Sequence, residues 1–201
     1  PSSQICDDAT FLRRVTIDIA GRLPTAEESV AFLNEQSPQK RTMLVDRLLD
    51  STDYADYFAN KWSAILRNKR NNDNDKLATY SFHDWIRQGF IDNKPYDQFV
   101  REIVTASGEI GVNQPVAWYR EVKDLSAQVE DTAQLFLGLR IQCARCHHHP
   151  FETWSQQDYY GFAAFYSQVG QKKGAAGKNR VFARRVVAQT PNPKTGQQVL
   201  A

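Results

Sequence analysis

A chain of 201 residues, 41% of them hydrophobic, can form a substantial core, so the composition predicts a globular fold. The formal net charge of +2 is too small to indicate nucleic-acid binding, and no apolar run approaches the roughly 18 residues that a membrane-spanning helix needs. We therefore expect neither a nucleic-acid partner nor a membrane span in this stretch of chain.

The N-terminal third is patterned as short amphipathic helices. An acidic cap and apolar residues at helical spacing predict a first helix over residues 8–20. Thr25 and Glu28 can form a capping box ahead of a second helix, in which each side chain bonds the other residue's backbone N–H. Pro38 at a first helical position opens a third helix, and Thr52 opens a fourth.

Two polar or glycine-containing segments interrupt the middle of the chain. Residues 67–76 lack apolar side chains, which predicts an exposed loop. Ser81 with Asp84 is expected to cap the next helix, and residues 93–95 separate that helix from another. The stretch 107–124 is predicted to be a long loop, and loops of that length are more often functional than idle.

A concentration of cysteine and histidine at residues 142–150 lies between two further helices. A cap at Ser126 predicts the helix that leads into this stretch, and Pro150 prevents a helix from continuing through it. A cap at Ser155 with Asp158 predicts the last helix.

The C-terminal tail is basic, because no acidic residue follows Asp158. The pairs 181–182 and 186–187, with a turn over 193–196 before 199–200, predict two short strands and a turn. The fold class that follows is all-α, a bundle of about seven or eight helices with a short β-ribbon near the C-terminus. We expect a helical domain over 1–170 and a basic tail or β-ribbon appendage over 171–201. The basic residues of the tail are Lys172, Lys173, Lys178, Arg180, Arg184, Arg185 and Lys194.

The stretch 142–150 contains the C-x-x-C-H pattern of c-type haem attachment. Each thiol can add across one vinyl group on the same edge of a porphyrin, and the next residue then lies under the iron, where imidazole is a normal proximal ligand. The pattern predicts haem c as the cofactor, with Cys143 and Cys146 as the thioether anchors and His147 as the axial iron ligand.

Three other interpretations of these residues stay open. Cys143, Cys146, His147 and His149 could together bind one zinc or iron ion, although structural zinc sites usually draw their ligands from separated segments. A redox C-x-x-C normally lies in a thioredoxin-like βαβ setting, which the predicted elements lack. The two cysteines could also be unmodified or form a plain disulfide.

Other residues are candidates for the surroundings of the haem. His149 follows the proximal ligand too closely to reach the opposite face of the ring, so we expect it to bond a propionate or to orient the loop before Pro150. Trp154 and Tyr159 approach the motif from its C-terminal side, where aromatic residues at helical spacing are often core.

The distal position of the iron has only weak candidates, Met43 and His83. Met43 stands among leucines and valine and is expected to fill the core, whereas His83 stands at a predicted helix start and is expected at the surface. We therefore predict a distal position without a strong-field residue from this domain, which would favour ligand binding or catalysis over pure electron transfer.

The motif also predicts the compartment. Covalent haem attachment takes place on the far side of the bacterial inner membrane, which implies the periplasm or the cell surface. The chain opens at Pro1 without methionine or a signal-peptide pattern, so we expect it to be a processed piece of a larger protein. Cys6 would then be unpaired within the chain in an oxidising compartment.

Several segments of the chain resemble a known family. These segments are residues 11–25, 93–97, 136–138 and 143–151, together with Trp154 and residues 158–160. In these segments the chain resembles the planctomycete cytochrome-c-associated domain of unknown function. The likeness covers nearly the whole chain, and the family pattern includes the C-x-x-C-H and a histidine two residues beyond it. The resemblance implies a large exported multidomain protein, so the expected partners are other domains of the same chain, among them a separate cytochrome c module.

Two functions follow from these observations. The first is a c-type haem-binding module with a redox role, either electron transfer or haem-based catalysis, within a larger exported protein. The second is a structural or interaction module in which the Cys/His cluster holds zinc or iron without redox activity.

Overall fold

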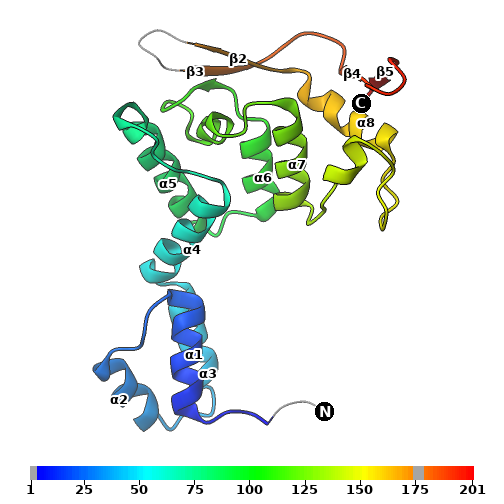
Figure 1. The fold of residues 1–201 in the computed structure, drawn as a ribbon. Coiled ribbons are helices and arrows are strands. Elements are labelled where there is room, and N and C mark those ends of the chain that lie inside the picture. Colours follow the sequence, from blue (N-terminus) through cyan, green and yellow to red (C-terminus); the bar gives the residue numbers. More distant parts are fainter. Residues whose placement is uncertain (1–3, 174–178) are drawn as a thin grey trace. The chain divides into compact units, whose positions relative to one another are not determined.

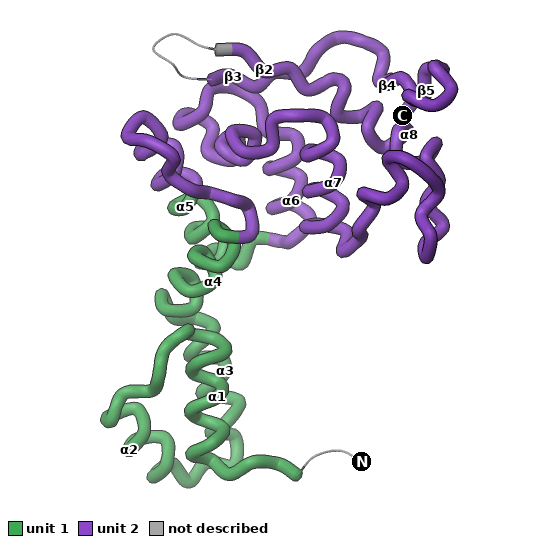
Figure 2. Tube along the Cα trace, viewed as in Figure 1, with its two compact units in different colours: residues 1–64, 83–94 green, residues 65–82, 95–201 purple. Residues whose placement is uncertain are grey.

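The computed structural model describes residues 4–173 and 179–201, and the chain divides into two compact units (Figures 1 and 2). Unit 1 comprises Pro1–Ala64 and His83–Lys94, and unit 2 comprises Ile65–Phe82 and Pro95–Ala201. In the described part of the chain, none of the helices combines the length and apolar character needed to span a membrane.

Unit 1 begins with helices α1 (Asp8–Ala20), α2 (Ala26–Asn34) and α3 (Lys40–Leu49). The predicted Thr25–Glu28 capping box is confirmed, with the Thr25 hydroxyl 3.1 Å from the Glu28 amide. Helix α1 packs against α2 and α3, and their apolar faces meet in a small core. That core consists of Leu12, Ala20, Phe32, Leu44 and Leu48.

The remainder of unit 1 is formed by α4 (Thr52–Ile65) and the second half of α5 (Lys76–Ile91). Three rings join these helices: the Tyr54 centroid lies 4.8 Å from that of Phe58 and 5.8 Å from that of Phe90. The prediction that Ser81 caps α5 is wrong, because the helix begins five residues earlier, after the short 3₁₀ turn η1 (Asp73–Asp75). The Ser81 hydroxyl instead donates to the carbonyl of Ala78 within the helix.

Unit 2 contains α6 (Tyr96–Val104), the 3₁₀ helix η2 (Gln114–Arg120), α7 (Leu125–Phe136), the 3₁₀ turn η3 (Gln142–Arg145) and α8 (Gln156–Tyr166). Helix α7 is capped by Asp124, whose carboxylate accepts from the Ala127 amide at 2.8 Å, and not by Ser126 as predicted. The Ser155–Asp158 capping box of α8 is confirmed.

The stretch 107–124 is not the predicted loop. It contains strand β1 (Gly108–Glu109) and η2, and the side chains of Val116, Trp118 and Tyr119 in η2 are buried. Burial of these apolar side chains explains why the segment adopts regular structure despite its glycines.

The four C-terminal strands and β1 form two small antiparallel sheets, β1-β3-β2 and β4-β5. Their bounds are β2 (Val169–Lys173), β3 (Asn179–Ala183), β4 (Gln189–Pro191) and β5 (Gln198–Leu200). Helix α8 contacts both β4 and β5. The predicted turn at 193–196 is present, but residues 186–187 lie outside the strands.

The fold is therefore mostly helical with small antiparallel sheets formed by the C-terminal strands. A single all-α bundle describes it incompletely, because β1 and β3 pair between distant parts of the chain and the helices belong to two units. The boundary expected at residue 170 stays a prediction. Of the basic residues of the tail, Lys178 lies outside the described residues, as does the side chain of Lys173.

Candidate functional site

The C-x-x-C-H motif lies on a short turn in unit 2 that begins just after α7. Gly138, with φ of 70°, ends the helix in the left-handed conformation that glycine adopts without steric cost. Ile141 and Ala144 are buried in the core that α7 and α8 share, and they anchor the turn η3. Cys143 and Cys146 are exposed on the same turn.

Backbone hydrogen bonds define the conformation of this turn. The amides of Cys146 and His147 both donate to the carbonyl of Cys143, at 3.2 and 3.3 Å, and the amide of Ala144 donates to that of Ile141 at 2.9 Å. Both motif cysteines are free thiols, so the structure gives no support to the plain disulfide.

The imidazole of His147 is exposed and has one nitrogen engaged. Its Nδ1 lies 2.7 Å from the carbonyl oxygen of His148. Because a carbonyl only accepts hydrogen bonds, Nδ1 must carry the proton, and the lone pair of the neutral ring is then on Nε2. A carbonyl partner on one nitrogen is the usual arrangement of a histidine that binds metal through the other.

In His149 the Nδ1 atom accepts hydrogen bonds, whereas in His147 it donates one. The His149 Nδ1 accepts from the amides of Phe151 and Glu152, at 3.3 and 3.0 Å, and the His149 amide donates to the carbonyl of Trp154 at 2.8 Å. The lone pair of the neutral ring is therefore occupied inside the loop. His149 orients residues 149–154 and, in this conformation, offers no lone pair to a metal ion.

The interpretation as a four-ligand zinc or iron site gains no support from this geometry. Across residues 4–173 and 179–201, no group of three or more His, Cys, Asp or Glu side chains is arranged to hold a metal ion. Covalent attachment of haem requires two accessible thiols and an imidazole whose lone pair is free to bind the iron. Cys143, Cys146 and the Nε2 lone pair of His147 meet these requirements, so the residues present fit a c-type haem.

Helix α8 binds the turn from one side. The side-chain amide of Gln156, only 8% exposed, donates to the carbonyls of Arg145 and Cys146 at 3.0 and 3.3 Å. The Tyr160 hydroxyl, one helical turn later, donates to the same Arg145 carbonyl at 3.2 Å.

An ion pair binds the turn to α7 on another side. Arg145 Nη1 lies 3.3 Å from Glu130 Oε1, and the buried Tyr159 hydroxyl donates to the same oxygen at 3.0 Å. The Glu130 carboxylate raises the pKa of the Arg145 guanidinium. Burial, followed by the Glu130 charge, raises the pKa of Tyr159, so the phenol stays a neutral donor.

Of the predicted contact residues, Tyr159 is buried and Trp154 is half-buried, and both belong to the core cluster beneath the turn. Sequence reasoning did not find Gln156, Tyr160 or Glu130. The spacing of Gln156 and Tyr160, four residues apart at a helix start, places both side chains on one face and could have indicated a shared target.

The weak distal candidates, Met43 and His83, both lie in unit 1. The expectation that Met43 fills the core is wrong: its side chain is 56% exposed, because Leu44 and Leu48 occupy the buried face of α3. His83 is half-buried, and its Nε2 lies 3.1 Å from Asn60 Oδ1.

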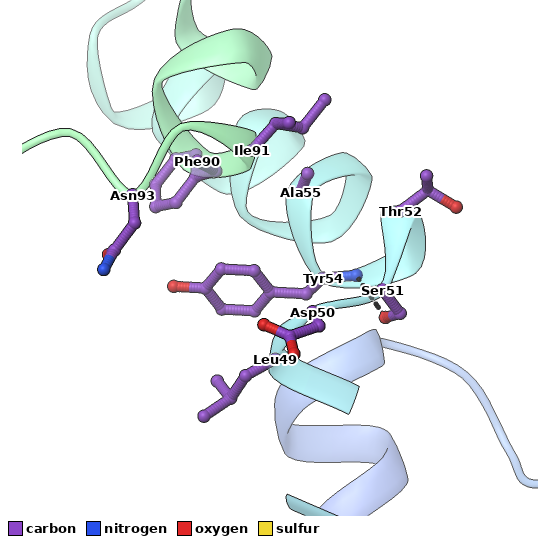
Figure 3. Close-up of a pocket in the computed structure, with 9 residues that line it drawn as sticks. All are labelled: Leu49, Asp50, Ser51, Thr52, Tyr54, Ala55, Phe90, Ile91 and Asn93. Atoms are coloured by element: carbon purple, nitrogen blue, oxygen red, sulfur yellow. Dashed lines mark hydrogen bonds between the residues drawn. The ribbon is translucent and has the colours of Figure 1, made fainter. Parts of the chain in front are cut away.

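Unit 1 also contains a cavity of about 360 Å³ between the end of α3, the start of α4 and the end of α5 (Figure 3). Its lining includes Tyr54, Phe90 and Asn93, together with the exposed carboxylate of Asp50. A second cavity of about 310 Å³ includes Met43 in its lining. No residue of the C-x-x-C-H motif lines either cavity.

Fold and site together define a mostly helical module that presents a C-x-x-C-H turn at its surface. Residues 1–171 match the family model PSCyt2, described as a protein of unknown function (DUF1549). The chain therefore belongs to this planctomycete cytochrome-associated domain family, which confirms the resemblance found in the sequence. No curated protein and no solved structure is significantly similar to the chain.

Proposed function

We propose that this chain is a c-type haem-binding module with a redox role within a larger exported protein. Cys143 and Cys146 would bond the haem through thioethers, and His147 would be the axial ligand of the iron through Nε2. The observation that carries the proposal is that these three side chains are accessible and free to react or to bind iron. Both thiols are free and exposed on a hydrogen-bonded turn, and the His147 Nδ1 is held by a carbonyl.

The roles of the protein groups follow from their chemistry. The thiols anchor the ring, and the imidazole sets the electron density at the iron. The bound haem would supply reversible one-electron chemistry. The family's association with cytochromes supports a redox role.

The compartment and partners are part of the proposal. Covalent attachment of haem implies the periplasm or the cell surface, and the family occurs in multidomain proteins. Other domains of the same chain, including a cytochrome c module, would then exchange electrons with this one. The family match ends at residue 171, close to the expected boundary between a domain over 1–170 and an appendage over 171–201, although both parts contribute strands to the sheet β1-β3-β2.

Expression in a bacterial host that exports the chain and attaches haem c tests the proposal. We expect a red protein whose Soret absorbance stays with the polypeptide after acid-acetone extraction. The double variant Cys143→Ser/Cys146→Ser should lose the covalent haem. The matched control Cys6→Ser, which removes the third thiol, should keep it.

The axial ligand needs its own variant. His147→Ala should keep the covalent haem, because both thioethers remain possible, but its absorption spectrum should change strongly. An unchanged spectrum would exclude His147 as the ligand. A colourless wild-type protein that contains zinc or non-haem iron would establish the alternative, a structural metal module.

A further inference from the structure

We propose that Gln156, assisted by Tyr160, is the positioning residue of the haem-binding turn, holding the backbone around Cys146 so that His147 keeps its place under the iron. The inference rests on the proposed function. Helix α8, which lies outside the motif, would then determine how strongly His147 ligates the iron.

The turn needs support from outside because it is short. Its 3₁₀ segment spans four residues, Gln142–Arg145, and so short a helix has little stability of its own. Cys143, Cys146 and His147 are all exposed, so they contribute little burial that would hold the turn. Ile141, just before it, and Ala144 within it are the buried residues that attach it to the core.

Gln156 supplies this support with a buried side-chain amide. One NH₂ group donates to two successive carbonyls, those of Arg145 and Cys146, the second of which directly precedes His147. A buried amide must find hydrogen-bond partners or incur a desolvation cost, so Gln156 is held in this orientation. The backbone of the second anchor is thereby connected to the first turn of α8.

Tyr160 strengthens the same connection. Its hydroxyl bonds the Arg145 carbonyl, which already accepts from Gln156, and a carbonyl oxygen has two lone pairs for two such donors. Helix α7 holds the Arg145 side chain through Glu130. Residue 145 is therefore bound through its backbone to α8 and through its guanidinium to α7.

Outer hydrogen bonds of this kind affect metal ligation even when they do not touch the metal. Loss of a partner that bonds a metal ligand directly commonly lowers affinity by about 10- to 100-fold, and because Gln156 bonds the backbone beside the ligand, we expect about tenfold. If the turn relaxes, the imidazole moves with the backbone, because the amide of His147 bonds the Cys143 carbonyl within the same turn. A loosened imidazole donates less to ferric iron, which destabilises the oxidised state relative to the reduced one.

The test compares Gln156→Met with Gln157→Met in the haem-loaded chain. Methionine has nearly the volume of glutamine but cannot donate, and Gln157 is the exposed neighbour on the same helix. We expect equal covalent haem in both variants. A tenfold weakening of ferric relative to ferrous ligation in Gln156→Met would raise its midpoint potential by about 59 mV. Gln157→Met should match the wild type.

Tyr160→Phe provides a milder variant should Gln156→Met fail to fold, and its potential should rise by less. A Gln156→Met or Tyr160→Phe haemoprotein with wild-type potential and spectrum would overturn the inference. Wild-type protein without covalent haem would instead refute the proposed function.

Hydrogen exchange of the haem-free chain tests the positioning independently of haem. Gln156→Met should exchange the amides of Cys146 and His147 at least about tenfold faster than Gln157→Met, because their bonds to the Cys143 carbonyl would open more often. Equal exchange in the two variants would overturn the inference whether or not the wild type carries haem.

Discussion

Removing the hydroxyl of Tyr159 deletes a hydrogen bond to an ionised acceptor that also pairs with Arg145 of the C-x-x-C-H turn. The phenol is 2% exposed and its hydroxyl lies 3.0 Å from Glu130 Oε1. Bonds to charged groups contribute about 1.5–3 kcal/mol. The Glu130 carboxylate keeps its ion pair with Arg145, and the Glu130 side chain is 18% exposed to water. The contribution of this hydrogen bond is therefore expected at the lower end of that range. We expect Tyr159→Phe to lower the free energy of unfolding by about 1.5 kcal/mol.

Urea unfolding followed by circular dichroism measures this loss. The midpoint should fall by roughly 1 M at an unchanged slope, since the surface exposed on unfolding stays the same. Tyr80→Phe is the matched control: Tyr80 is 55% exposed, so the change should stay within about 0.5 kcal/mol.

A double-mutant cycle with Arg145→Ala tests the link to the motif. Tyr159 and Arg145 share one carboxylate oxygen, so their effects should depart from additivity by about 0.5 kcal/mol or more. A loss in Tyr159→Phe no larger than in the control, or strict additivity in the cycle, would refute the reasoning.

Three further predictions concern the stability of unit 1 and the proposed haem. Gly21→Ala should destabilise the chain by more than about 2 kcal/mol in urea unfolding, because Gly21 has φ of 69° and a Cβ there would lie 2.1 Å from the Tyr57 ring. Gly196→Ala, with φ of 70° and open space, should cost less. Hydrogen bonding from Arg22 lowers the pKa of Glu28 from 4.5 to about 2. The ionised Glu28 carboxylate therefore stabilises the fold above pH 4.5, and this stabilisation is lost as the pH falls towards 2. Glu28→Gln should be less stable than the wild type at pH 7 and nearly equal near pH 2, and an equal difference at both pH values would contradict this. Carbon monoxide should change the spectrum of the ferrous haem protein, whereas an unchanged low-spin spectrum would show that a protein ligand occupies the distal position.

Local sequence determined the features whose interactions lie within a few residues. Two of the predicted caps are present, Thr25 with Glu28 and Ser155 with Asp158, because a cap involves only residues three apart. The caps predicted at Ser81 and Ser126 are wrong, because α5 begins at Lys76 and Asp124 caps α7. The C-x-x-C-H motif was visible for the same reason. These signals were sufficient to predict a mostly helical fold, the family and the candidate anchors.

The tertiary structure decided everything that depends on residues distant in sequence. Strand β1 pairs with β3 at Gly108 and Val181, and no local pattern specifies that register. The tautomers of His147 and His149 depend on partners only one to three residues away, but the folded backbone of the loop decides which carbonyl and which amides reach each ring. The contacts of Arg145 with Glu130 of α7 and Gln156 of α8 form only where the turn η3 packs against both helices. Burial and hydrogen-bond geometry at this point depend on the packed chain, so the residues next to Arg145 in the sequence do not predict them.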